Sequence, residues 1–282
     1  MNDASSHTAP AGFTEQTELS ELAGPIPIGT PAQRLAGRVC LVVGGTSGIG
    51  RATAVRMAQE GACAVVVTGR RKALGEALAD DIRRLGAKSL FVAADVTREA
   101  DIASTIAQTM AQFGRLDAVF NNAGFQESRA RLADQTDAVY SQVFDTNVRA
   151  VFHAMRHEIP ALLASGGGTI VNNTSVSGVR NPNAGLSLYG ASKAALNSLT
   201  RAAAMEYAPS GIRINAVAPG RVVTAMMLAS GIADMRSVAA GLPLKRMGHP
   251  EEVAAAVVWL TSSESSYVVG HVLAADGGFL AG

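Results

Sequence analysis

Short runs of apolar, mostly β-branched residues alternate along the chain with longer amphipathic stretches. Seven of these runs are candidate strands, at residues 38–43, 64–68, 89–93, 117–121, 168–173, 212–218 and 271–275. Most are separated by roughly 12 or more residues in which apolar positions recur with helical spacing. This alternation predicts a doubly wound α/β fold, in which a seven-stranded parallel sheet carries helices on both faces through right-handed crossovers.

The N-terminal stretch, residues 1–37, shows neither helical nor strand periodicity and is rich in Ser, Thr, Pro and Gly. We expect a flexible or surface-wrapped extension there, followed by one Rossmann-like domain over 38–282. A chain of 282 residues that is 48% hydrophobic is long enough to bury one large core.

Charge and composition narrow the kind of ligand. The 24 basic and 23 acidic residues nearly balance, unlike the strongly basic surface of a nucleic-acid-binding protein. No apolar run reaches the roughly 18 residues needed to span a membrane, and the first basic residue is Arg34, which argues against a secretory signal. Only two cysteines occur, Cys40 and Cys63, so a disulfide framework is not expected. We therefore expect a cytoplasmic protein with a small-molecule substrate and no nucleic-acid or membrane partner.

A glycine-rich turn, LVVGGTSGIGRATA, follows the first candidate strand and opens the first helical stretch. Backbone N–H groups at such a turn can hold a pyrophosphate, because the helix dipole adds to their hydrogen bonds. Gly44 permits the tight turn, Gly48 lets the phosphates approach, and Gly50 lets the helix pack closely on the sheet. An NTPase is not indicated, since Arg51-Ala52 stands where a P-loop requires Lys-Ser/Thr.

The spacing G-x-x-x-G-x-G resembles that of the short-chain dehydrogenase/reductase family, and further motifs of this family follow in its usual order. They are NNAG at 121–124, DTN ending at Asn147, TSVSG containing Ser175, YGASK containing Tyr189 and Lys193, APGRVVT, and ADGG at 275–278. The resemblance covers residues 38–282 and implies an NAD(P)-dependent ketoreductase or secondary alcohol dehydrogenase. Two details depart from the pattern: Val43 stands where Thr commonly precedes the first glycine, and the loop from Ser175 to Tyr189 is one residue longer than usual.

The expected chemistry also follows from the residues. Hydride transfer to a ketone leaves negative charge on oxygen, so the site needs a proton donor, Tyr189, and an orienting hydrogen bond, from Ser175. A free tyrosine, with a pKa near ~10, is a poor acid or base at neutral pH. Lys193 lies one helical turn further on, which would place its ammonium near the phenol and the cofactor ribose. The resemblance implies that Asn147 holds a water linking Lys193 to solvent.

The resemblance further implies a cofactor site at the glycine turn and the ends of the later strands. Its residues are Gly44, Thr46, Ser47, Gly48, Ile49, Gly50, Arg70, Asp95, Val96, Asn122, Ala123, Gly124, Tyr189, Lys193, Pro219, Gly220, Val222 and Thr224. Gly69 stands where NAD-using relatives often carry an acid that holds the ribose 2′-hydroxyl. An acid would repel a 2′-phosphate, whereas Arg70 would bind it. We expect NADP(H) as the preferred cofactor, with an NAD-linked alcohol dehydrogenase as the alternative.

The substrate pocket is expected to be apolar. Its candidate residues are Phe125, Leu186, Leu188, Met226 and Met227. Residues 226–247 correspond to the family's mobile lid and contain four of the nine methionines, which suit an apolar ligand. Members of the family that reduce acyl-carrier substrates tend to place Arg or Lys beside the site, where they can bind an acidic carrier protein. At the corresponding positions of this chain only Arg213 is basic, and it lies within a candidate strand. We expect a free, uncharged, hydrophobic or aryl ketone and its alcohol, and Arg180 or Arg221 would serve a charged substrate instead.

Other functions stay open at this point. A 3-oxoacyl thioester reductase would share the catalytic set, and a non-catalytic nicotinamide-sensing regulator would keep the glycine turn but have no use for Tyr, Lys and Ser. His153 and His157 are four residues apart, but no H-E-x-x-H pattern occurs, so we expect no metal. The resemblance implies a homo-oligomer, often a tetramer, with Ala-rich helices at 150–164 and 191–208 in the interface.

Overall fold

The computed structural model describes Leu22, residues 31–181 and residues 184–282. At its centre lies a parallel sheet with the strand order β3-β2-β1-β4-β5-β6-β7. The strands are β1 (Val39–Val43), β2 (Ala64–Gly69), β3 (Lys88–Ala93), β4 (Ala118–Asn121), β5 (Gly168–Asn173), β6 (Ile212–Pro219) and β7 (Val272–Ala275). All seven candidate strands are present, and the doubly wound α/β fold is confirmed.

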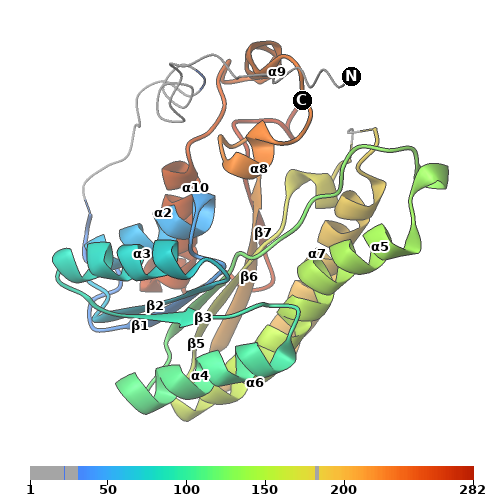
Figure 1. Cartoon of the computed structure of the whole chain (residues 1–282). Coiled ribbons are helices and arrows are strands. Elements are labelled where there is room, and N and C mark those ends of the chain that lie inside the picture. Colours follow the sequence, from blue (N-terminus) through green and yellow to red (C-terminus); the bar gives the residue numbers. More distant parts are fainter. Residues whose placement is uncertain (1–21, 23–30, 182–183) are drawn as a thin grey trace, which may run out of the picture.

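Helices cover both faces of the sheet (Figure 1). One face is covered by α2 (Gly48–Gln59), α3 (Lys72–Arg84) and α10 (Pro250–Thr261), and the other by α4 (Glu99–Phe113), α6 (Ala150–Ala164) and α7 (Ser187–Tyr207). The remaining helices are α5 (Asp137–Phe144), a π-helical turn at Asp145–Arg149, α8 (Ala225–Leu228) and α9 (Met235–Gly241). Short 3-10 turns lie at Leu132–Asp134, Val176–Gly178, Ala208–Ser210 and Ser263–Ser265.

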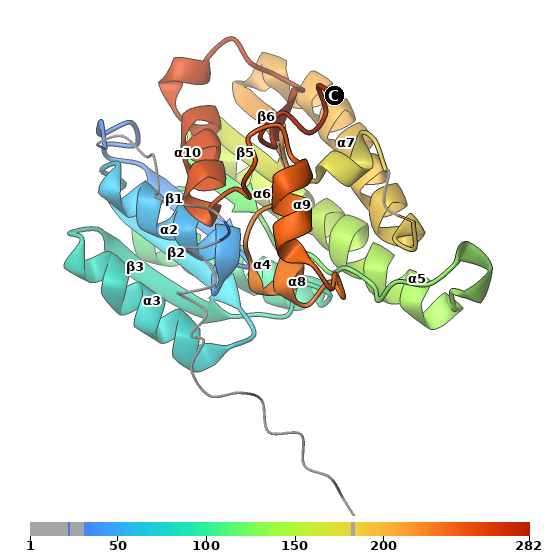
Figure 2. The same ribbon diagram turned by 90° about the horizontal axis from the view of Figure 1, so that it is seen from above.

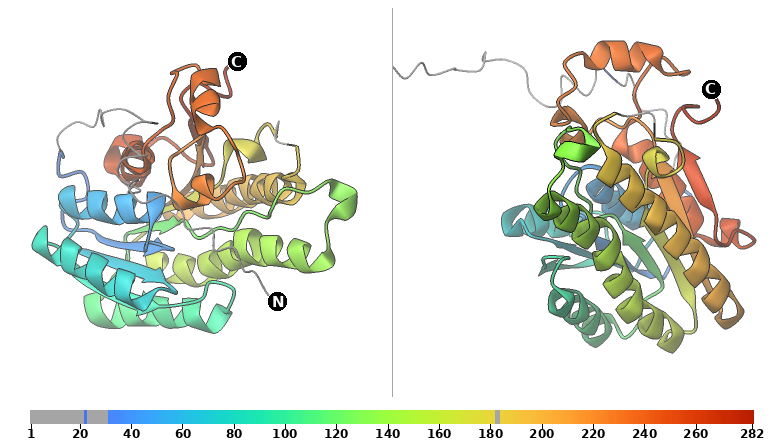
Figure 3. Two further views of the ribbon diagram at one scale, coloured as in Figure 1. Left: turned by 45° about the horizontal axis from the view of Figure 1, so that its top comes forward. Right: turned by 90° about the vertical axis from the view of Figure 1, so that its right-hand side faces the viewer.

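The inner strands read as continuous apolar runs because helices bury them from both sides. Every residue of β1, β2 and β4 is buried, whereas the edge strands β3 and β7 are partly exposed. The helices α8 and α9 follow β6, so they lie over the carboxyl ends of the strands. Seen from above, they run between α10 and α7 (Figure 2), and the side views place them at one end of the sheet (Figure 3).

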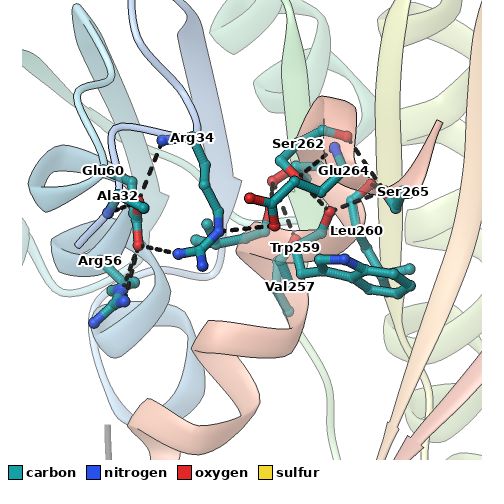
Figure 4. A network of polar contacts seen from close by, with 12 residues as sticks. Ala32, Arg34, Arg56, Glu60, Val257, Trp259, Leu260, Ser262, Glu264 and Ser265 are labelled. Atoms are coloured by element: carbon teal, nitrogen blue, oxygen red, sulfur yellow. Dashed lines mark hydrogen bonds and ion pairs between the residues drawn. The ribbon is translucent and has the colours of Figure 1, made fainter. Parts of the chain in front are cut away.

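The folded part begins before residue 38. Leu35 is fully buried and belongs to the core cluster under α2 and α10. The buried carboxylate of Glu60 accepts hydrogen bonds from the backbone N–H groups of Ala32 and Arg34, at 2.8 and 3.2 Å, and from the side chains of Arg34 and Arg56 (Figure 4). A buried charge paired in this way fixes the chain that enters β1, because leaving it unpaired would be costly.

The rest of the predicted extension, residues 1–21 and 23–30, lies outside the described residues. Leu22 is described, and its carbonyl accepts a hydrogen bond from the backbone of Met247 at 3.1 Å. Its side chain packs against a small apolar cluster under α8 and α9 that includes Val223 and Leu242. In the described part of the chain, no helix is long and apolar enough to cross a membrane.

Candidate active site

The glycine turn between β1 and α2 leaves no room for side chains at two of its predicted positions. Gly44 has a φ of +81°, and a Cβ there would lie 2.7 Å from the backbone nitrogen of Ala123. A Cβ on Gly50 would overlap the carbonyl oxygen of Gly44. The turn therefore keeps its backbone close to the end of β4, as a cradle for a pyrophosphate requires.

The turn is tied to the strands that carry the catalytic candidates. The side-chain amide of Asn122, after β4, donates to the carbonyl of Gly44 at 2.7 Å. Its side-chain oxygen accepts from Asn173, at the end of β5. This arrangement needs two amides side by side at the sheet edge, and the NNAG and GTIVNN motifs supply them.

Tyr189 and Ser175 line the same cleft although they are fourteen positions apart in the sequence. Tyr189 lies in the first turn of α7, and Ser175 caps the 3-10 turn after β5. Burial raises the pKa of the Tyr189 phenol above its usual value, while the nearby Ser175 hydroxyl acts in the opposite direction.

Lys193 projects from the next turn of α7 and is 3% exposed. Its ammonium lies 5.7 Å from the centre of the Tyr189 ring and donates to the carbonyl of Asn173 at 2.8 Å. Burial lowers the pKa of Lys193 to about 8, because the charged form loses its water. The lysine side chain lies over the aromatic face of the tyrosine.

Asn147 is fully buried in the π-helical turn between α5 and α6, a distortion often found at functional sites. Its amide makes a two-way contact with the backbone of Phe125: Oδ1 accepts from the N–H and Nδ2 donates to the C=O, both at 2.8 Å. A Cβ on Gly124 would lie 3.4 Å from Asn147 Oδ1 and 3.5 Å from Lys193 Nζ. Asn147 and Lys193 therefore flank the same glycine.

Two arginines, Arg70 and Arg71, follow β2, and Arg71 contacts the glycine turn. Arg71 donates to the hydroxyls of Thr46 and Ser47 at 3.0 and 2.6 Å. A Cβ on Gly69 would come within 2.7 Å of the Thr46 methyl group. The sequence analysis named Arg70 as the candidate and not Arg71, although the two arginines are adjacent in the stretch TGRR and the sequence gave equal reason to consider each.

Asp95, after β3, holds a local turn. One of its oxygens accepts from the backbone and hydroxyl of Thr97, at 3.0 and 2.8 Å. These hydrogen bonds, with the nearby charges of Arg70 and Arg98, lower the pKa of Asp95. The carboxylate is therefore fixed at the edge of the sheet, close to Arg70.

A cleft of about 110 Å³ at the carboxyl end of the sheet brings together Ser175, Tyr189 and Lys193, whereas Asn147, Arg70 and Asp95 are not among the described residues that line it. The predicted residues that line it are Ile49, Asn122, Gly124, Ser175, Leu186, Tyr189, Lys193, Pro219, Gly220, Val222, Thr224, Met226 and Met227. Phe125 and Leu188 are not among the described residues that line it. Gln126 and Arg221 do line it, and sequence reasoning had missed Gln126. A larger cavity of about 370 Å³ shares Arg221 and Val222 with this cleft, but it is otherwise lined by the segment after α9, the start of α10 and the end of β7, and Tyr189 is not among its lining residues.

The two histidines of α6 are placed outside this cleft. His153 and His157 both face Glu99 of α4, at 3.7 and 3.0 Å. Within the described residues, no group of three or more His, Cys, Asp and Glu side chains is arranged to hold a metal ion.

A doubly wound sheet with a glycine turn after β1, and with Ser, Tyr and Lys together at its carboxyl edge, has the organisation of a dinucleotide-dependent oxidoreductase. Residues 43–280 match the family described as "Enoyl-(Acyl carrier protein) reductase". The chain is 43% identical over 250 residues to the A-factor type gamma-butyrolactone 1′-reductase (1S-forming) of Streptomyces virginiae, which covers 87% of this chain and 96% of that protein.

Two further relatives agree. The cyclohexanol dehydrogenase of Acinetobacter sp. (strain SE19) is 37% identical over 245 residues, or 86% of this chain and 94% of that protein. The crystal structure of levodione reductase superposes with a TM-score of 0.84 at 36% identity, covering 88% of this chain and 99% of the other. The chain therefore belongs to the short-chain dehydrogenase/reductase family and is an NAD(P)-dependent oxidoreductase.

Proposed function

We propose that the protein interconverts a small, largely apolar cyclic ketone and its secondary alcohol, with NADP(H) as the preferred cofactor. The observation that carries this proposal is that Tyr189 and Ser175 line one cleft together with the apolar side chains of Leu186, Met226 and Met227. Such walls would bury apolar substrate surface at roughly 25 cal/mol per Å².

The chain's own groups divide the work of the reaction. The nicotinamide, when bound, supplies or accepts the hydride. Tyr189 donates a proton to the carbonyl oxygen in the reductive direction and takes one from the alcohol in the other, while Ser175 orients that oxygen. The ammonium of Lys193 favours the phenolate, and Asn147, across Gly124, supports a water-mediated proton path to Lys193.

The cradle fits a dinucleotide, because its backbone packs so closely that side chains at Gly44 and Gly50 would overlap the backbone of Ala123 and the carbonyl of Gly44. The remaining predicted cofactor residues, Gly48, Val96, Pro219 and Thr224 among them, lie around this turn or at neighbouring strand ends. For the 2′-phosphate we propose Arg70 together with Arg71. A guanidinium beside Ser47, with glycine in place of an acid at position 69, favours the phosphorylated cofactor.

A ring substrate is supported by the names of two relatives, which are reductases or dehydrogenases of a butyrolactone and of cyclohexanol. The position of Arg213 argues against an acyl-carrier substrate, because this is the basic residue that the sequence offered for binding the carrier. Arg213 lies in β6 and donates to the carbonyls of Leu260, Ser262 and Ser265 at 3.2, 2.7 and 2.8 Å. Its guanidinium is therefore used to cap the end of α10.

Nicotinamide absorbance with a substrate panel tests the proposal. We expect the highest kcat/KM for cyclohexanol-type alcohols and aryl or alicyclic ketones, and a preference for NADPH over NADH. A clear preference for a 3-oxoacyl carrier thioester would replace the proposed substrate class. A preference for a carboxylated keto acid would instead assign the anion to Arg221 or Arg180, of which Arg221 lines the cleft. No turnover with any of them would leave a nicotinamide-sensing regulator.

We also propose a homo-oligomer in a reducing compartment such as the cytoplasm. Phe152 and Leu163 on α6 and Met205 on α7 are 46%, 42% and 75% exposed, which suits an interface built from these helices. Cys63 is exposed and unpaired, as expected where thiols stay reduced. Light scattering in solution tests the assembly.

A further inference from the structure

The first turn of α7, which carries Tyr189, has no cap of its own. Its N-cap position is Leu186, whose side chain cannot accept a hydrogen bond. The free backbone N–H groups of Leu188 and Tyr189 donate instead to one carboxylate oxygen of Glu127, at 3.1 and 3.0 Å. Glu127 is 3% exposed and comes from the segment after β4, about 60 residues earlier in the chain.

The same segment is fixed at its other end by a residue of the site. The backbone of Phe125 is held on both sides by Asn147. Further on, Arg129 donates to the carbonyl of Ala184 at 2.7 Å, just before α7. Residues 125–130 thus form a brace that runs from Asn147 to the start of the helix bearing the tyrosine.

Charged groups surround the phenol of Tyr189 from three elements. Glu127, from the segment after β4, accepts hydrogen bonds from the first turn of α7, Lys193 lies on α7 itself, and Arg221 follows β6. The charge of Glu127 raises the pKa of the phenol, whereas that of Arg221 lowers it. Arg129 is close enough to lower the pKa of Arg221, though burial of Arg221 is the larger cause.

We propose that Glu127 is a positioning residue of this site. Its carboxylate fixes the first turn of α7, and with it the ring of Tyr189, and its negative charge opposes loss of the phenolic proton. This charge acts against the nearby guanidinium of Arg221, which favours the phenolate. This inference rests on the proposed role of Tyr189 as the proton donor, and goes beyond it by naming the group that places and tunes the tyrosine.

The obvious alternative is a helix cap that serves stability alone, and two replacements separate these roles. In Glu127→Gln, the amide oxygen can still accept both backbone hydrogen bonds but the charge is gone. In Glu127→Ala, the hydrogen-bond acceptor and the charge are both lost. The second carboxylate oxygen of Glu127 has no hydrogen-bond partner in the described part of the chain, so the Gln amide nitrogen would break no existing bond there.

The charge is tested without any substrate, by ultraviolet titration of the phenol. The chain has four tyrosines, and subtracting the curve of Tyr189→Phe, with and without the Glu127 change, isolates Tyr189. We expect Glu127→Gln to move the midpoint of Tyr189 down by roughly half a pH unit or more. An unchanged midpoint would overturn the proposed effect of the charge. Because this readout needs no turnover, it still decides the inference if the proposed substrates prove wrong.

The positioning is tested by steady-state kinetics on the best ketone of the panel. We expect Glu127→Ala to lower kcat by about tenfold or more with the cofactor KM nearly unchanged, because the tyrosine and not the cofactor turn is displaced. Glu127→Gln should keep most of kcat, with its pH profile shifted downward. The matched control is Asp134→Asn, an exposed carboxylate nearby in the chain, which should behave as wild type. A Glu127→Ala protein with normal kcat, or a Gln variant whose pH profile does not move, would reduce Glu127 to a helix cap.

Discussion

The side-chain amide of Asn173 donates a hydrogen bond to the side-chain oxygen of Asn122 at 2.8 Å. Asn122 also holds the carbonyl of Gly44, and the carbonyl of Asn173 accepts from Lys193. The glycine turn and the lysine of the site are therefore joined by consecutive hydrogen bonds through the ends of β4 and β5. A substitution near Lys193 should therefore also alter cofactor binding at the glycine turn.

Replacing Asn173 tests this link. Asn173→Ala removes the donor to Asn122 but keeps the backbone carbonyl for Lys193, so we expect cofactor affinity to fall by about threefold to tenfold, the effect of one lost hydrogen bond. Asn173→Asp should lower cofactor affinity further, because a carboxylate would face the side-chain oxygen of Asn122. Cofactor titration by fluorescence measures both. Equal affinity for wild type and the Asp variant would show that the link does not matter.

Tyr189→Phe should lower kcat by roughly 100-fold to 10,000-fold, since it removes only the hydroxyl that we propose transfers the proton. Cofactor should still bind, because the glycine turn is untouched. The matched control is Tyr140→Phe on α5, where the ring is 49% exposed and stacks on Phe144. Steady-state kinetics with cofactor titration checks both variants, and near-normal turnover of Tyr189→Phe would remove the tyrosine from the mechanism.

The choice of cofactor should depend on the arginines after β2. Arg70→Ala and Arg71→Ala should each reduce kcat/KM for NADPH by about 10-fold to 100-fold, the range for a hydrogen bond to a charged group, and leave NADH much less affected. Arg51→Ala, an exposed arginine of α2 paired with Asp81, is the control. If both cofactors lose equally, the arginines do not read the 2′-phosphate.

Glu158 should make stability fall as the pH rises. Burial in α6 raises the pKa of its carboxyl to about 8, although Asn121 donates to it at 3.0 Å. The folded protein thus holds this proton more tightly than the unfolded chain, so the stabilising contribution is complete below the ordinary carboxyl pKa and is lost as the pH rises through about 8.

Glu158→Gln keeps an acceptor for Asn121 and cannot ionise. The free energy of unfolding of the Gln variant, relative to that of wild type, should therefore rise by up to about 1.4 kcal/mol for each pH unit between about pH 5 and pH 8. Urea unfolding at several pH values measures this difference, with Asp134→Asn as the exposed control. A difference between Gln variant and wild type that stays constant with pH would contradict the prediction.

The seven strands and their parallel arrangement could be predicted because the same local signal recurs along the chain. Runs such as VCLVV and AVVVT are apolar at every position, and only a sheet covered on both faces buries such runs. The glycine turn was equally readable, since the φ of Gly44 and the close packing of Gly50 are properties that only glycine supplies.

The parts of the site that were missed depend on partners distant in sequence. Glu127 follows the NNAG motif in an unremarkable stretch, FQESR, and nothing local shows that it meets the start of α7. The apolar N-cap at Leu186 was the available signal, because a helix that begins without Ser, Thr, Asp or Asn must find its acceptor elsewhere. Arg71 was missed because the direction of a long flexible side chain is set by its neighbours, here Thr46 and Ser47.

The distant cap on α7 also bears on the order in which the chain acquires structure. A helix whose first turn lacks an acceptor begins poorly by itself, since nucleation is its costly step. The start of α7 can be completed only after the segment following β4 has closed a loop of about 60 residues onto it. An isolated peptide of residues 186–208 should therefore fray at its beginning, so the turn that carries the tyrosine forms late, once the centre of the sheet is in place.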